Sequence, residues 1–175
     1  MHLFFCGVSL KTSKETATVK NLLLFFLLSL FFSLFSAEIT GMVVGVSDGD
    51  TITVLDDMDQ GKFRIRLDKI DAPEKKQAFG NKAKQYLSAL IFGKKVTIRV
   101  KSIDNYGRIL GIVSLDGAEI NLQMVQNGFA WHYNYYDKTP AYMEAEKQAR
   151  VEQKGLWQDP APINPFDYRK QNKKR

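Results

Sequence analysis

The feature that most constrains the fold is a series of short β-strand patterns, separated by turn residues, between residues 39 and 115. Phe63, Ile65 and Leu67 alternate with charged residues, a period of two that is typical of a strand with one buried face. Asp-Gly dipeptides at residues 48–49 and 116–117 predict tight turns between neighbouring strands. The pattern therefore predicts an antiparallel arrangement of consecutive strands.

Three helical patterns accompany these strands, over residues 75–92, 120–127 and 140–155, and each ends beside a glycine. Pro140 suits the first position of the last helix, and Thr139 is its candidate cap. A helix between the third and fourth strands is the order expected of a small Greek-key barrel of the OB type. We therefore predict an α+β, mainly β fold: a five-stranded OB-fold barrel with about three helices.

The first 37 residues differ in composition from the rest of the chain, since seven of the twelve phenylalanines fall there. Residues 22–37 are an apolar stretch that follows three lysines and is short for a membrane span of about 20 residues. This pattern predicts a signal peptide over residues 1–37 and an exported protein, whether secreted, periplasmic or at the cell surface. Phe35 and Leu34 make the cleavage site imperfect, so an uncleaved membrane anchor through residues 22–37 stays open.

Without this segment the chain keeps 22 basic and 18 acidic side chains, a net charge of +4, and it loses its single cysteine, Cys6. We expect one folded domain over residues 38–158 and no disulfide in it. Residues 159–175 form a Pro-containing basic C-terminal tail, which we expect to be extended or disordered from Pro160 onward. Its basic cluster favours a polyanionic partner, although a solvated tail that aids solubility explains the charge equally well.

Five charged residues are suited to phosphoryl transfer. Asp50, Asp71 and Glu74 are candidate carboxylates for a hard divalent cation, which prefers oxygen ligands. Arg66 and Arg108 are candidate guanidinium groups for charge that develops on phosphoryl oxygens. A metal, a carboxylate base and two arginines together predict phosphodiester cleavage.

Each segment also has an ordinary structural explanation. Residues 48–51 read first as a hairpin turn, and residues 71–74 read as a strand exit that leads into a helix. Arg64 and Arg66 suit the solvated face of a strand, and Arg108 suits an exposed position after a turn. The functional interpretation therefore depends on whether these groups meet in one place.

The segments as a set resemble the staphylococcal nuclease (thermonuclease) family. They occur in the order of that family, and the resemblance spans residues 39–158. Each segment alone is a weak signal, whereas the ordered combination is specific. The segments are Val46–Thr51, Arg66–Glu74, Asp104–Arg108 and Gly155–Trp157.

The resemblance implies a metal site. By similarity, Asp50 and Asp71 are carboxylate ligands of a catalytic Ca²⁺, and the backbone carbonyl of Ala72 is a further ligand. The family often has threonine at the position of Ala72, a change that a carbonyl ligand tolerates. The carboxylates alone would equally suit Mg²⁺ or Mn²⁺.

The resemblance also implies a reaction. Glu74 matches the carboxylate that positions or deprotonates the attacking water, and Arg66 and Arg108 match the two groups that hold the phosphate. Together with the leader, which predicts export, the resemblance implies a monomeric, Ca²⁺-dependent nuclease that cuts DNA and RNA with little sequence preference and leaves 3′-phosphates. Two alternatives stay open: a noncatalytic nucleic-acid-binding module, and a membrane-anchored component of DNA uptake.

Substrate contacts are expected from two tyrosines. Tyr106 keeps the aromatic hydroxyl of its family position, whereas Asn105 stands where well-known members have lysine. Residues 131–136 fall where the family places tyrosines beside the base, and an ungapped alignment puts Asn134 and Tyr136 at those positions. Packing at the barrel rim would explain the same aromatics, and His132 is more simply a packed residue than a base.

One structural consequence follows from the spacing of Arg66 and Asp71. Strict alternation would put them on opposite faces of a strand. We therefore expect the strand to bulge or end near residues 69–70, so that both side chains reach one site.

Overall fold

The computed structural model describes residues 37–58 and 61–172. Nearly all of the predicted leader, including the apolar stretch before Ala37, lies outside the described residues. Within the described ranges no helix is long and apolar enough to cross a membrane.

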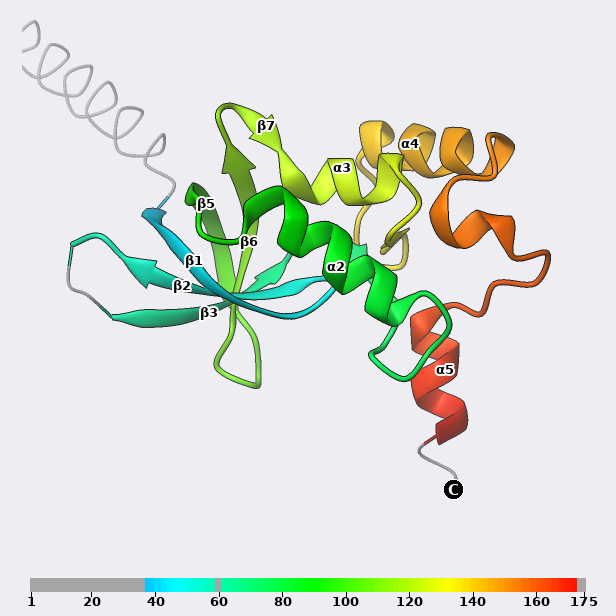
Figure 1. Ribbon diagram of the computed structural model, residues 1–175, viewed down its shortest axis with the longest axis horizontal. Helices are drawn as coiled ribbons and strands as arrows, with labels where there is room; N and C mark the ends of the chain where they lie inside the picture. The colour runs from blue at the N-terminus through cyan, green and yellow to red at the C-terminus, as the bar shows by residue number, and fades with distance from the viewer. Residues whose placement is uncertain (1–36, 59–60, 173–175) are drawn as a thin grey trace, which may run out of the picture. The chain divides into compact units, whose positions relative to one another are not determined.

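Five strands close into a barrel, as the sequence predicts (Figure 1). β1 pairs antiparallel with β2 and β5, β2 pairs with β3, and β5 pairs with β6. A parallel pairing of β3 with β6, in which Ile65 lies opposite Ile109, closes the barrel. The strands are β1 (Glu38–Asp48), β2 (Thr51–Asp56), β3 (Lys62–Leu67), β5 (Lys95–Ile103) and β6 (Ile109–Leu115).

Helix α2 (Gly80–Ile91) connects the two halves of the barrel and crosses in front of it in Figure 1. Ala83, Leu87 and Ile91 recur every four residues and are fully buried against the strands. The helix begins later than the predicted residue 75, because residues 75–79 form turns. A Cβ at Gly80 would lie 1.9 Å from the carbonyl oxygen of Glu74, so this turn segment packs directly against the helix start.

The remaining elements cover one end of the barrel. The predicted helices are present as α3 and α4, and a pairing of β4 with β8 sets Asp71 opposite Trp131. Thr139 occupies the cap position of α4 without a side-chain cap bond, since its hydroxyl donates to Asp137 instead. These elements are β4 (Ile70–Asp71), β7 (Ala118–Glu119), α3 (Ile120–Gln126), β8 (Trp131–His132), α4 (Pro140–Val151) and the 3₁₀ helix η1 (Gly155–Gln158).

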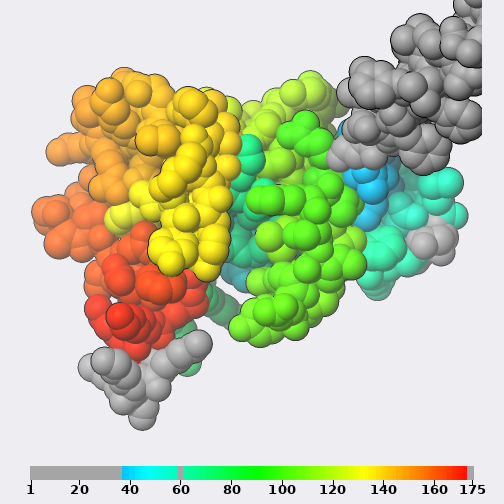
Figure 2. All heavy atoms as spheres, turned by 180° about the vertical axis from the view of Figure 1, so that it is seen from behind, coloured from blue at the N-terminus to red at the C-terminus, as the bar shows by residue number. Residues whose placement is uncertain are grey.

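The expectation of an extended or disordered tail from Pro160 is wrong for residues Pro165–Asn172, because they form helix α5. Asn164 caps it: its Oδ1 accepts the backbone N–H of Phe166 at 2.9 Å, and Pro165 suits the first helical position. Figure 2 shows this red C-terminal segment packed beneath the orange residues that precede it. With α5 the described chain has four α-helices, one more than predicted.

Candidate active site

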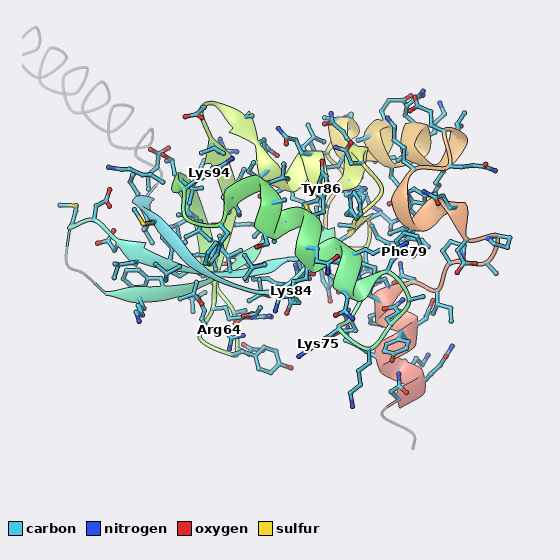
Figure 3. The ribbon with its side chains drawn as sticks, viewed as in Figure 1. Arg64, Lys75, Phe79, Lys84, Tyr86 and Lys94 are labelled. Carbon is cyan, nitrogen blue, oxygen red and sulfur yellow. The ribbon has the colours of Figure 1, made fainter. Side chains whose placement is uncertain are left out.

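An open cavity of about 490 Å³ brings together residues from distant parts of the chain. It is lined by the β1–β2 turn, the end of β3, the segment after β4, the β5–β6 turn and α5. Seven of the eight predicted site residues line it: Asp50, Arg66, Asp71, Ala72, Glu74, Tyr106 and Arg108. Arg64, the other arginine of β3, is exposed and is not among the lining residues (Figure 3).

A break after β3 allows Arg66 and Asp71 to reach the same place. β3 ends at Leu67, and Lys69 adopts a left-handed backbone conformation with φ of 66° before β4 begins at Ile70. The interruption changes the alternation of side chains, and Arg66 Nη2 donates to Asp71 Oδ1 at 3.0 Å. The expected break near residues 69–70 is therefore confirmed.

Asp50 lies in the β1–β2 turn and is almost completely buried. Its Oδ2 accepts the backbone N–H of Ala72 at 2.8 Å and lies 3.1 Å from Arg66 Nη1. Burial raises the pKa of Asp50 to about 7, Arg66 lowers it in part, and the neighbouring Asp48 raises it again. The turn thus holds a carboxylate whose negative charge is only partly compensated.

Asp71 is 1% exposed, and β4 fixes its position through the pairing with β8. Two arginines surround its carboxylate: Arg66 donates to Oδ1, while Arg169 donates to Oδ1 at 3.1 Å and to Oδ2 at 2.8 Å. Arg66 also donates to the carbonyl oxygens of Leu67 and Ile70, both at 3.0 Å. Four acceptors thereby fix the guanidinium of Arg66: those two carbonyls, Asp71 Oδ1 and Asp50 Oδ2.

Glu74 lies on the segment between β4 and α2, the same segment on which Figure 3 labels Lys75 and Phe79. Its carboxylate is 40% exposed at the cavity, and Oε1 accepts a hydrogen bond from Arg169 at 2.8 Å. Its backbone N–H donates to the side chain of Gln77 at 3.1 Å, which helps to hold the turn. Glu74 is therefore the accessible carboxylate of the site, whereas Asp50 and Asp71 are buried.

Arg108 approaches the cavity from the β5–β6 turn. Its Nε and Nη2 each lie 2.8 Å from Asp104 Oδ2, and its backbone N–H donates to Asp104 Oδ1 at 3.0 Å. Burial raises the pKa of Asp104, but the hydrogen bonds from Arg108 and Tyr106 outweigh burial and keep this pKa below its ordinary value. The ionised Asp104 orients the guanidinium, and Tyr106 lies beside it, with its ring centroid 5.4 Å from Arg108 Cζ.

The aromatic residues of the 131–136 segment are divided between the cavity and the outside. Tyr133 lines the cavity, while Tyr136 is 71% exposed and contacts Tyr133 with a centroid separation of 5.1 Å. His132 is buried, with Nε2 2.8 Å from Asp137, and it is not among the lining residues. Tyr136 therefore reaches the cavity only through Tyr133, which sequence reasoning did not select.

Arg169 is the second lining residue that sequence reasoning missed as part of the site. It comes from α5, about 100 residues after the carboxylates that it contacts. The basic cluster at the C-terminus was visible in the sequence, but no local pattern indicated that one of its members faces Asp71. The only sequence pattern that indicates an ordered segment there is Asn164 followed by Pro165, which is typical of a helix start.

The donor atoms fit a hard divalent cation. Within the described ranges no cluster of three or more histidine, cysteine, aspartate or glutamate side chains is close enough to form a metal site. The two buried carboxylates of Asp50 and Asp71 nevertheless both pair with the guanidinium of Arg66. This one guanidinium only partly balances the negative charge of Asp50. A buried carboxylate whose charge is only partly balanced, beside a second buried carboxylate at the edge of a cavity, is a suitable oxygen environment for Ca²⁺ or Mg²⁺.

Fold and site together define an OB-fold phosphodiesterase, with buried carboxylates, an accessible carboxylate and two oriented arginines around one cavity. The family model described as staphylococcal nuclease homologue matches residues 64–159. A Shigella flexneri protein named micrococcal nuclease is 45% identical over 148 residues, 78% of this chain and 84% of its own. A Haemophilus influenzae protein named uncharacterized endonuclease is 44% identical over 134 residues, 77% of this chain and 75% of its own. The chain belongs to the staphylococcal nuclease family.

Proposed function

We propose that this protein is an exported, Ca²⁺-dependent nuclease that hydrolyses phosphodiester bonds of DNA and RNA with little sequence preference. The single observation that carries the proposal is the convergence of all five predicted charged residues on one cavity. Those five are Asp50, Arg66, Asp71, Glu74 and Arg108.

Each residue has a role that suits its environment. Glu74 is the accessible carboxylate and takes the proton from a water that attacks the phosphorus atom in line with the leaving oxygen. The bond from phosphorus to that leaving oxygen breaks, and the oxygen takes up a proton from solvent. Arg66 and Arg108 are held by acidic partners, so their guanidinium groups are oriented in advance toward the phosphoryl oxygens. Preorganised positive charge of this kind costs little reorganisation when the transition state forms.

Asp50, Asp71 and the carbonyl of Ala72 are the residues that would hold the cation. Bound there, Ca²⁺ would supply Lewis-acid charge for the phosphoryl oxygens. The similarity to the family supports Ca²⁺ as the metal and 3′-phosphates as the product ends. The proposal of export is supported by the leader sequence alone. N-terminal sequencing of protein recovered outside the cytoplasm tests both export and cleavage near Ala37.

The test of the activity compares cleavage of DNA and of RNA by the purified protein in Ca²⁺ and in a chelator. We expect Arg108→Ala to lose at least a hundredfold in rate. Arg64→Ala is the matched control, because it removes the same charge from an exposed position outside the cavity, and we expect it to keep the wild-type rate. Tight binding of nucleic acid without cleavage in Ca²⁺ would instead identify a noncatalytic binding module.

A further inference from the structure

The contacts of Arg169 are unusual because they tie the C-terminal helix to the carboxylates of the proposed metal site. Both oxygens of Asp71 accept hydrogen bonds from this guanidinium, at 3.1 and 2.8 Å, and Glu74 Oε1 accepts another at 2.8 Å. Such bidentate pairing is the strongest geometry for an arginine and a carboxylate. One side chain thus engages both a predicted metal ligand and the predicted base.

A divalent cation and Arg169 would compete for these groups. Ca²⁺ binds carboxylate oxygens at about 2.3–2.6 Å and gathers six to eight ligands around itself. Asp71 is 1% exposed, and the N–H groups of Arg66 and Arg169 already occupy its two oxygens. A guanidinium on the same carboxylate repels the incoming cation and takes acceptor positions that the cation needs.

Helix α5 has few other attachments. Of its eight residues only Pro165 is buried, and Phe166 is 54% exposed at the rim of the cavity. Tyr168 is half-buried and lines a second, smaller hollow with Phe79 and Trp131. Ahead of the helix, Gln77 Nε2 donates to the carbonyl of Ile163 at 2.6 Å. Across residues 37–58 and 61–172, the ion pairs of Arg169 are the only ones that join α5 to the rest of the protein. Elements held by few apolar contacts open at low cost in free energy.

We propose that α5 is an autoinhibitory strap, in which Arg169 acts as an internal counter-ion that must leave Asp71 and Glu74 before a divalent cation binds. The inference rests on the proposed metal site and adds its regulation. Cation binding and release of α5 are then coupled, and the coupling is reciprocal: anything that holds α5 in place weakens metal binding, and the metal weakens the attachment of α5. Arg169 thereby balances the charge of Asp71 until the cation arrives.

The experiment measures Ca²⁺ binding by isothermal titration calorimetry, without substrate, for the wild-type protein, Arg169→Gln and Lys170→Gln. Lys170 is the matched control, since it is exposed on the same helix and its substitution removes the same charge. We expect Arg169→Gln to bind Ca²⁺ at least tenfold more tightly than wild type, and Lys170→Gln to stay within twofold of it.

Hydrogen–deuterium exchange of the α5 amides supplies a second readout that needs no variant. Saturating Ca²⁺ is expected to raise exchange in residues 166–172 of the wild-type protein, while Arg169→Gln shows the raised exchange without Ca²⁺. The wild-type measurement therefore tests the strap even where Arg169→Gln folds poorly.

Two failures are distinguishable. Ca²⁺ that binds wild type and Arg169→Gln with equal affinity, or binds the variant more weakly, overturns the strap and leaves the proposed function intact. So does unchanged protection of α5 in Ca²⁺-saturated wild type. Absence of Ca²⁺ binding to both proteins overturns the proposed metal site and the strap together.

Discussion

The buried carboxylate of Asp50 is predicted to destabilise the protein in the absence of metal, so Asp50→Asn should stabilise it. The amide is nearly isosteric, and its oxygen still accepts the Ala72 N–H that Asp50 Oδ2 accepts at 2.8 Å. The substitution removes the charge that burial penalises while it keeps the hydrogen bond from Ala72. Asp50 would thus stabilise the folded protein less than a neutral asparagine at the same position.

The magnitude follows from the pKa of Asp50, which burial raises from 3.8 to about 7. Because the folded-state pKa is the higher one, the folded protein holds the proton through a range in which the unfolded chain has lost it. Wild-type stability from this group is therefore full below pH 3.8 and is lost as pH rises toward 7. At about 1.4 kcal/mol per pKa unit, the loss reaches about 4 kcal/mol at pH 8 and roughly 2 kcal/mol at pH 5.

The assay is urea denaturation of wild type and Asp50→Asn in a chelator between pH 5 and 8. We expect Asp50→Asn to be the more stable protein at pH 8, with an advantage that shrinks by about 2 kcal/mol at pH 5. Asp116→Asn, on the exposed β6–β7 turn, controls for loss of one negative charge. A pH-independent difference, or an Asp50→Asn protein that is less stable than wild type at pH 8, would refute the reasoning.

Three further predictions concern metal, core and loop. Saturating Ca²⁺ should raise the midpoint of thermal unfolding of the wild-type protein and leave the midpoint of Asp50→Asn nearly unchanged, which scanning calorimetry measures. Equal shifts in the two proteins would place the cation at another site. Asn121→Ala removes an amide that bonds three buried backbone groups and should cost about 3 kcal/mol in chemical denaturation; a loss below about 1 kcal/mol contradicts it. Gly80→Ala puts a Cβ 1.9 Å from the Glu74 carbonyl and should lower kcat by displacing this loop, so an unchanged kcat would count against its role.

Much of the barrel could be predicted because its signals are local. Alternation marks strands, glycines mark their turns, and the helical spacing of Ala83 and Leu87 marks the buried face of α2. The same spacing points to Leu90 as the next buried position, whereas the structure buries Ile91. The strand break before Ile70 was predictable for a different reason, since it is the only way for Arg66 and Asp71 to share one site. A functional constraint thus predicted a local backbone feature that propensity alone did not indicate.

The remaining parts depend on contacts between distant segments. Arg169 meets Asp71 across 98 residues, and neither local sequence carries a signal of the other. Tyr133 rather than Tyr136 lines the cavity, because the short pairing of β4 with β8 sets which side of this aromatic segment faces inward. Sequence spacing could locate that segment within a residue or two, but only tertiary packing selects the residue that points into the site.

The central claim is that Glu74 acts as the base of a Ca²⁺-dependent phosphodiester cleavage. Single-turnover cleavage of an end-labelled oligonucleotide by the purified protein, in Ca²⁺ and in EGTA, tests it most directly when wild type is compared with Glu74→Gln. We predict cleavage by wild type in Ca²⁺ alone, and a rate at least a hundredfold lower for Glu74→Gln, with oligonucleotide binding retained. Cleavage that continues in EGTA, or a Glu74→Gln protein that cleaves at the wild-type rate, would contradict the claim.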